Sequence, residues 1–267
     1  MRESDSQQPD EGSAPNVQQT NPAKRIYAIV LVALEQNTGV AALEAWARTF
    51  GIDIAAANMN PHDVIDRLRL MNDEIGNLRR LMKKTQFSPD LYEPTLQNVL
   101  RLLSVSNLAA GWHGYVGSVS EANLLALRWC SEAIESETGL THDELQSLLD
   151  ALNVFKEHVE LEDLPDSVRE FLLRQIELMT QGLHQYPIIG RRAAREAVRN
   201  AAAEFMDIDE SVLNSAPSSH WAKMAMLWKN LLAGVEGSEK MIKAVTGVAK
   251  SVPKLAEVVS AAAKLIS

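Results

Sequence analysis

Along most of this chain, hydrophobic positions recur at intervals of three and four residues, the period of a helix with one buried face. The clearest case is the segment 164–205, where one apolar stripe follows Pro165 and a second follows a break at residues 186–190. The first stripe consists of Val168, Phe171, Leu172, Ile176, Met179 and Leu183, and the second of Ala194, Ala197, Val198, Ala201 and Phe205. This pattern predicts a helical hairpin, and the small side chains of its second helix predict a close approach of the two helices.

The same period predicts further helices over residues 26–35, 40–50 and about 60–84, and after the start signals at Ser88, Ser118 and Thr141. Two of the stripes alternate spacings of four and three residues. They are Val64, Leu68, Met71, Ile75, Leu78 and Met82, and Leu145, Leu148, Leu152, Phe155 and Val159. Such heptad-like positions predict burial inside the bundle or at the interface of a homo-oligomer.

No stretch alternates polar and apolar residues as a strand does, and Gly and Pro are few and lie mostly at boundaries. We therefore predict an all-α protein, a multi-helix bundle of about ten or eleven helices with a C-terminal amphipathic helical appendage. The polar residues 1–22 are expected to be a disordered leader. Residues 23–206 form the predicted main helical bundle, 207–219 a polar linker containing Pro217, and 220–267 the cationic amphipathic C-terminal helices.

Charge is unevenly distributed between these parts. Residues 220–267 contain seven Lys and three Glu, which gives this segment a net charge of +4. Because the whole chain has a net charge of −9, the first 219 residues have a net charge of −13. An acidic chain of this kind is not expected to bind nucleic acid in general, because it lacks a large basic face. One cysteine and no signal peptide predict a cytoplasmic protein, peripheral at a membrane in one interpretation.

The C-terminal segment has the composition of an interfacial membrane helix and also of an ordinary pair of core helices. Its candidate membrane- or partner-binding residues are Trp221, Trp228, Met241, Lys243, Val245, Lys250, Leu255, Lys264 and Ile266. We therefore expect a non-enzymatic interaction protein whose C-terminal helices engage a protein partner or an anionic membrane. The most specific version of this hypothesis is a bacterial membrane-perturbing toxin or defence effector. The alternative is an adaptor or structural subunit in which these helices belong to the core.

Four arginines lie close together at the start of the hairpin's second helix: Arg191, Arg192, Arg195 and Arg199. Cations at the positive end of a helix dipole require compensation. The compensating groups are expected to be Glu170, Glu177 or Glu196, or else an external phosphate, lipid head group or acidic protein.

The loop 111–117 combines three glycines with Trp112, His113 and Tyr115. These residues form a candidate ligand loop, or a helix corner whose aromatic rings are core. An enzyme that uses His113 and the arginines Arg191, Arg195 and Arg199 on an anionic ligand is the alternative function. No HExxH, CxxC or Gly-rich phosphate loop occurs, and the pair His158 and Glu162 is weak evidence alone, so no metal or cofactor is expected.

Overall fold

The computed structural model describes residues 18–215 and 217–233 of the chain, and almost all of this part is helical. The all-α prediction is therefore confirmed. The elements in order are β1 (Gln18–Thr20), α1 (Pro22–Leu34), α2 (Ala42–Thr49), α3 (Ile54–Met59), α4 (His62–Met82), the short 3₁₀ helix η1 (Pro89–Leu91), α5 (Glu93–Leu102), α6 (His113–Val116), α7 (Glu121–Ala133), β2 (Glu137–Gly139), α8 (His142–Leu161), α9 (Asp166–Ile189), α10 (Arg191–Asp207), α11 (Glu210–Ser215) and α12 (Ser218–Ala233).

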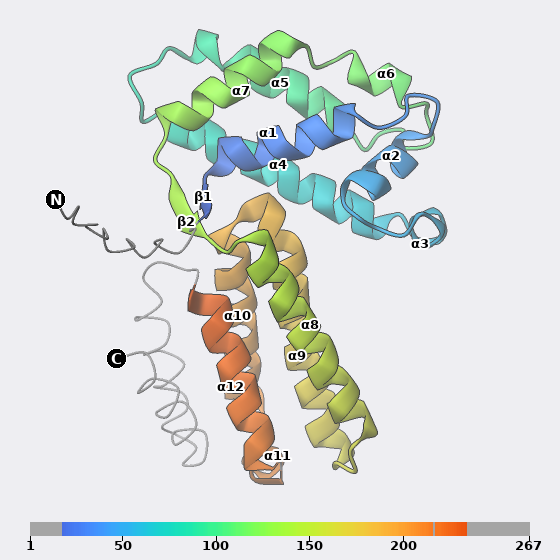
Figure 1. Cartoon of the computed structure of the whole chain (residues 1–267), viewed down its shortest axis with the longest axis vertical. Coiled ribbons are helices and arrows are strands. Elements are labelled where there is room, and N and C mark those ends of the chain that lie inside the picture. The colour runs from blue at the N-terminus through green and yellow to red at the C-terminus, as the bar shows by residue number, and fades with distance from the viewer. Residues whose placement is uncertain (1–17, 216, 234–267) are drawn as a thin grey trace, which may run out of the picture.

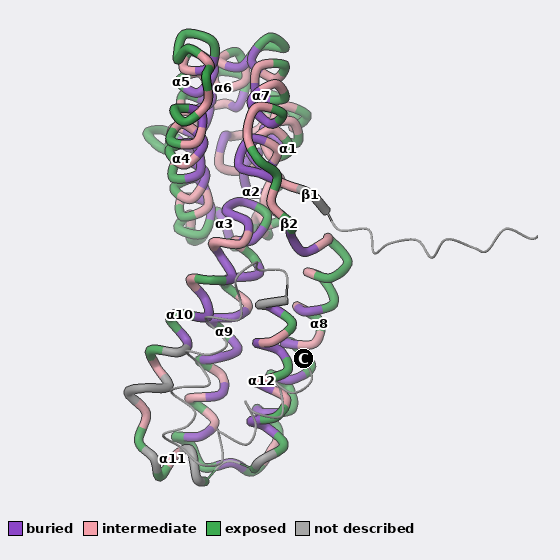
Figure 2. The backbone as a smooth tube through the Cα atoms, turned by 90° about the vertical axis from the view of Figure 1, so that its left-hand side faces the viewer, coloured by how far each residue is buried: buried purple, intermediate pink, exposed green. Residues whose placement is uncertain are grey.

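The N-terminal half, α1 to α7, lies across one end of the molecule (Figure 1). In it α1 packs on α7 and on α4, and α4 packs on α5, so that two helix pairs enclose a core (Figure 2). Trp46 and Trp112 are fully buried there, with their ring centroids 5.3 Å apart in an edge-to-face arrangement. β1 pairs antiparallel with β2 and brings the start of α1 beside the chain that leads into α8.

The C-terminal half is a four-helix bundle of α8, α9, α10 and α12, which run alternately down and up (Figure 1). Each helix packs on the next, and α12 also packs on α8, so the four form a closed ring. The predicted close approach of the hairpin helices is confirmed, because a Cβ placed on Gly182 of α9 would lie 2.6 Å from the Cβ of Ala197 on α10.

The burial predicted from the heptad-like stripes is confirmed for Leu68, Ile75 and Leu148, whereas Phe171 of the hairpin's first stripe is only partly buried. The predicted helix start at Thr141 is also confirmed, and there Thr141 and Glu144 form a capping box. The start predicted at Ser118 is displaced by two residues, since Ser120 is the N-cap of α7 and forms a capping box with Asn123.

The structure corrects three predicted boundaries. Residues 18–22 belong to the fold and not to the leader, because they form β1 and begin α1, with Asn21 as the N-cap. The segment 207–219 is not a plain linker, since it contains α11 and the start of α12. The hairpin corner is shorter than predicted: α9 continues through Pro187 to Ile189, and Gly190 alone separates it from α10.

The division of the chain also lies elsewhere than predicted. The two halves meet near β2, and α12 belongs to the same bundle as α8, α9 and α10 and not to a separate appendage. Within the described residues, no helix combines the length and the apolar character that crossing a bilayer requires.

Candidate functional site

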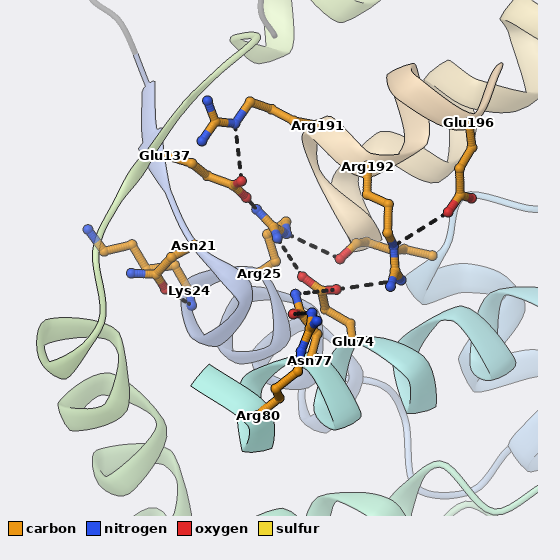
Figure 3. Close-up of polar contacts among 11 residues, drawn as sticks. Asn21, Lys24, Arg25, Glu74, Asn77, Arg80, Glu137, Arg191, Arg192 and Glu196 are labelled. Atoms are coloured by element: carbon orange, nitrogen blue, oxygen red, sulfur yellow. Dashed lines mark hydrogen bonds and ion pairs between the residues drawn. The ribbon is translucent and has the colours of Figure 1, made fainter. Parts of the chain in front are cut away.

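Charged side chains from four elements meet where the two halves of the molecule join (Figure 3). We call this set the junction network. Its members are Arg25 of α1, Glu74 of α4, Glu137 of β2, and Arg191 and Arg192 of α10. Arg25 is only 7% exposed and Glu74 is fully buried, so the network includes ionic groups removed from water.

The guanidinium of Arg25 lies at the centre of the network. It donates hydrogen bonds to Glu74 and to Glu137, and its Nε donates to the backbone carbonyl of Ile188 at 3.2 Å. Nε of Arg191 lies 3.1 Å from Oε2 of Glu137, and Nη2 of Arg192 lies 3.6 Å from Oε2 of Glu74. Each carboxylate is therefore shared by two guanidinium groups, which offsets the free energy lost on burying the charges.

Gly190 allows the corner between α9 and α10 to approach this network. Its φ of +56° and ψ of −142° lie in a region that residues with a Cβ avoid. A Cβ at this position would lie 2.5 Å from Nη1 of Arg25 and 2.9 Å from Oε1 of Glu137. Both the backbone conformation and the available space therefore require glycine.

The structure divides the predicted arginine stripe in two. Arg191 and Arg192 face the junction carboxylates, and Arg192 also lies 3.9 Å from Glu196, one of the predicted partners. Arg195 and Arg199 have exposed side chains farther along α10. The positive end of α10 is thus compensated largely by Glu74 and Glu137, which sequence reasoning did not identify. Of the other expected partners, Glu177 pairs with Arg174 at 2.9 Å.

In the loop 111–117, the structure separates the three candidate residues. Trp112 is a fully buried core residue whose Nε1 donates to the carbonyl of Ala33 at 3.1 Å. Tyr115 stacks on Trp112 and donates its hydroxyl to the carbonyl of Asn107 at 2.7 Å. His113 is exposed, and among the described residues no carboxylate contacts its ring. The arrangement is that of a helix corner with aromatic core residues.

Of the C-terminal candidates, only two lie in the described part. Trp221 and Trp228 are 2% and 6% exposed, and with Met224, Leu227 and Leu231 they form the inward face of α12. Met241, Lys243, Val245, Lys250, Leu255, Lys264 and Ile266 lie outside the described residues.

A cavity of about 390 Å³ lies between α4, α8 and α9 on the bundle side of the junction. Its wall includes Asp66, Arg67, Lys156, Glu177 and His184, so both signs of charge face it. Burial, and then the charge of Arg67, lower the pKa of His184 below its ordinary value, which keeps this imidazole neutral near pH 7. The cavity can take a small polar molecule, but its balanced charge selects no class of ligand.

The sequence contained only a faint signal for Arg25, Glu74 and Glu137. Arg25 directly precedes the apolar run that begins at Ile26, and Glu74 directly precedes Ile75 of a buried stripe. Charged residues at such positions are exposed unless they are paired. Their partners lie on distant elements, which a single sequence does not identify.

No protein-family model, curated protein or solved structure matches the chain.

Proposed function

We propose that this protein is a non-enzymatic interaction protein: a helical body that carries residues 234–267 as a cationic amphipathic segment and binds an anionic membrane surface through it. The proposal rests on one observation, the contrast between α12 and the segment that follows it. The apolar face of α12 is covered by its neighbours in the bundle, whereas the following segment repeats the apolar pattern beside lysines.

Burial of Trp221, Trp228 and the other inward residues of α12 removes this helix from the surfaces available for binding. This burial favours the interpretation that α12 is a core helix. Membrane binding is therefore proposed only for the residues that follow α12. These contain five Lys and three Glu, together with an apolar stripe of Met241, Val245, Val248, Val252, Leu255, Val259, Ala262 and Ile266. A helix with this pattern buries its apolar face in the lipid interface and holds its lysines at the head groups.

Binding without catalysis is supported by the surroundings of the residues that would have served an enzyme. Arg191 and Arg192 contact carboxylates of the junction network, so they are not available as an anion clamp. Trp112 is core, and His113 has no carboxylate beside it among the described residues to orient it as a base.

Vesicle sedimentation with the full chain and with a chain ending at Ala233 tests the proposal. The cut is placed after α12 because removing α12 would uncover the core residues of α8 and α10 and unfold the bundle. We expect the full chain to sediment with vesicles containing anionic lipid and not with neutral ones. We expect the truncated chain to keep its melting temperature and to lose binding.

A charge-reversal variant refines this test. Lysines near anionic lipid contribute about 1 kcal/mol each, so changing Lys243, Lys250 and Lys264 to Glu should weaken binding at least about 100-fold. The matched control makes the same change of charge on the body, at the exposed Lys83, Lys84 and Lys156. Equal loss in both variants, or vesicle binding by the chain ending at Ala233, would refute the proposal.

The finer form of the proposal is a membrane-perturbing effector. Its test is dye leakage from the same anionic vesicles. Dye leakage that depends on residues 234–267 would support a toxin or defence role. Vesicle binding without leakage would support membrane attachment alone. If the full chain does not bind vesicles, the membrane proposal is wrong, and a protein partner becomes the expected ligand of residues 234–267.

A further inference from the structure

His158, Glu162 and His220 meet at the end of the bundle far from the junction, and we call them the histidine cluster. His158 lies in the last turn of α8, Glu162 is the C-cap of that helix, and His220 lies in the first turn of α12. One ligand atom from each residue lies within 4.8 Å of the other two. Nε2 of His158 and Nε2 of His220 lie 3.4 Å and 2.9 Å from Oε2 of Glu162.

The cluster contains buried polar atoms without hydrogen-bond partners. His220 is 4% exposed, and neither of its ring nitrogens makes a hydrogen bond within the described residues. Oε2 of Glu162 is likewise buried without a hydrogen bond, although Nε2 of His220 lies only 2.9 Å away. Because buried polar side chains almost always have a partner, a bound ion would supply what these atoms lack.

We propose that the histidine cluster is a divalent transition-metal site that takes Zn²⁺ and fastens α12 to α8. Two imidazoles and one carboxylate form a zinc ligand set that leaves a fourth position for water. Ligand atoms about 2.0 to 2.1 Å from a tetrahedral ion are about 3.3 Å apart. The two distances to Glu162 are close to this value, so small side-chain rotations bring all three atoms around one ion.

The surroundings suit a cation. The site lies at the C-terminal end of the 20-residue helix α8, where the helix dipole is negative. Glu162 is held from its backbone side, since Nη2 of Arg169 donates to its carbonyl at 3.1 Å and its own N–H donates to the carbonyl of His158 at 3.1 Å. His158 is exposed at the surface, which gives the ion a path of entry.

A metal here would connect the first and last helices of the bundle ring. Because α12 and α8 are neighbours in the ring but not consecutive along the chain, the metal would fix the one contact of the ring that no connecting segment secures. This inference does not depend on membrane binding by residues 234–267.

The test uses the full chain, freed of metal by chelation, and Zn²⁺ as the probe. Calorimetry should show one Zn²⁺ bound per chain, and the melting temperature should rise with Zn²⁺ concentration until the site is saturated. Loss of an outer-shell partner weakens metal binding about 10- to 100-fold, so loss of a direct ligand in His158→Ala should weaken it at least as much. The matched control is His142→Ala, which removes an exposed histidine at the opposite end of the same helix.

His158 is the preferred position to change because its exposed side chain is not needed for folding. Glu162→Gln is the second variant, since it removes the charge and keeps the size of the side chain. The proposal is supported if Zn²⁺ raises the melting temperature of the unmodified chain and of His142→Ala, and raises that of His158→Ala and Glu162→Gln much less. It is overturned if Zn²⁺ affects all four proteins equally or none of them, in which case the cluster is a set of contacts within the protein alone.

Discussion

The junction network and the histidine cluster are both places where charged or ionisable side chains leave water, and they lie at opposite ends of the four-helix bundle. At the junction, two carboxylates are shared among three guanidinium groups, and Arg25 also donates to a backbone carbonyl. In the histidine cluster, a carboxylate oxygen and both nitrogens of His220 are buried without a hydrogen bond inside the described part of the chain. Both carboxylates of the junction thus have guanidinium partners within the protein, although Nε of Arg192 is buried without a hydrogen bond, whereas the one carboxylate of the histidine cluster has only imidazoles beside it among the described residues.

This difference suggests that the buried charges of the junction network hold the fold together, whereas those of the histidine cluster are suited to binding a ligand. A network of paired charges specifies how two parts of the fold fit together, because each partner is lost if the parts shift. A cluster whose buried polar atoms lack hydrogen bonds costs free energy in the absence of a ligand. Arg191 and Arg192, two of the four arginines that the sequence offered as an anion site, belong to the first class, and His220, which the sequence did not single out, belongs to the second.

The largest expected effect comes from breaking the junction network. Glu74→Ala removes a fully buried carboxylate and leaves Arg25 with one carboxylate fewer, so it should lower the free energy of unfolding by about 3 to 5 kcal/mol. Urea unfolding followed by circular dichroism measures this. Glu44→Ala is the control: it breaks the surface pair with Arg48 and should cost at most about 1 kcal/mol. Equal effects of the two substitutions would show that the junction carries no special stability.

A smaller loss is expected from Gly190→Ala. The backbone conformation alone should cost about 1 to 3 kcal/mol, and the added Cβ would also push Arg25 away from Glu137. Gly51→Ala separates these two contributions, because Gly51 has a φ of +65° and open space around its Cα. If Gly190→Ala is no more destabilising than Gly51→Ala in the same urea experiment, the junction accommodates the added side chain.

Cys130 extends the comparison to a buried ionisable group in the N-terminal half. Burial raises the pKa of its thiol to about 11 from an ordinary value of 9.0. Between these two values the unfolded thiol loses its proton while the folded thiol keeps it. Its contribution to stability is therefore complete below about pH 9 and is lost as the pH rises toward 11, by at most about 1.4 kcal/mol for each pH unit.

Urea unfolding of the unmodified chain and of Cys130→Ala at pH 8, 9, 10 and 11 measures this contribution. The stability difference between the two proteins should become less favourable to the cysteine as the pH rises. Burial also raises the pKa of Tyr186, but both proteins contain this residue, so its effect cancels. Stabilities that fall in parallel would show that the thiol titrates alike in the folded and unfolded chain.

The fold was largely predictable because the apolar period survives in nearly every helix. Leu68, Ile75 and Leu148 are buried as their spacing indicates, and the capping box at Thr141 starts α8. The errors arose where local signals compete with tertiary contacts. Residues 186–190 were expected to break the hairpin, but Pro187 near the end of the helix frees only one carbonyl, and burial of Ile188 and Ile189 holds the last turn of α9 in place.

The candidate sites were far less predictable, because their residues come from distant parts of the chain. Glu74 and Arg25 are 49 residues apart, and Glu137 and Arg25 are 112 apart. The sequence could indicate that the arginines of α10 needed compensation, but not which carboxylates supply it. In the same way, the spacing of His158 and Glu162 was visible, whereas the third member of the cluster, His220, lies on another helix.

The pairing of β1 with β2 has a consequence for the order in which the chain can fold during synthesis. Asn21 caps α1 and donates to the carbonyl of Ser131, 110 residues later, and Arg25 waits for Glu137 over a similar distance. At ribosomal rates of about 5 to 20 residues per second, α1 is present for roughly 5 to 20 seconds before these partners are made. The bundle, by contrast, begins with a hairpin whose two helices are consecutive. Of the described helices α1 is made first, yet Asn21 and Arg25 meet these two partners only when α7 and β2 have been synthesised, and until then Arg25 lacks Glu137.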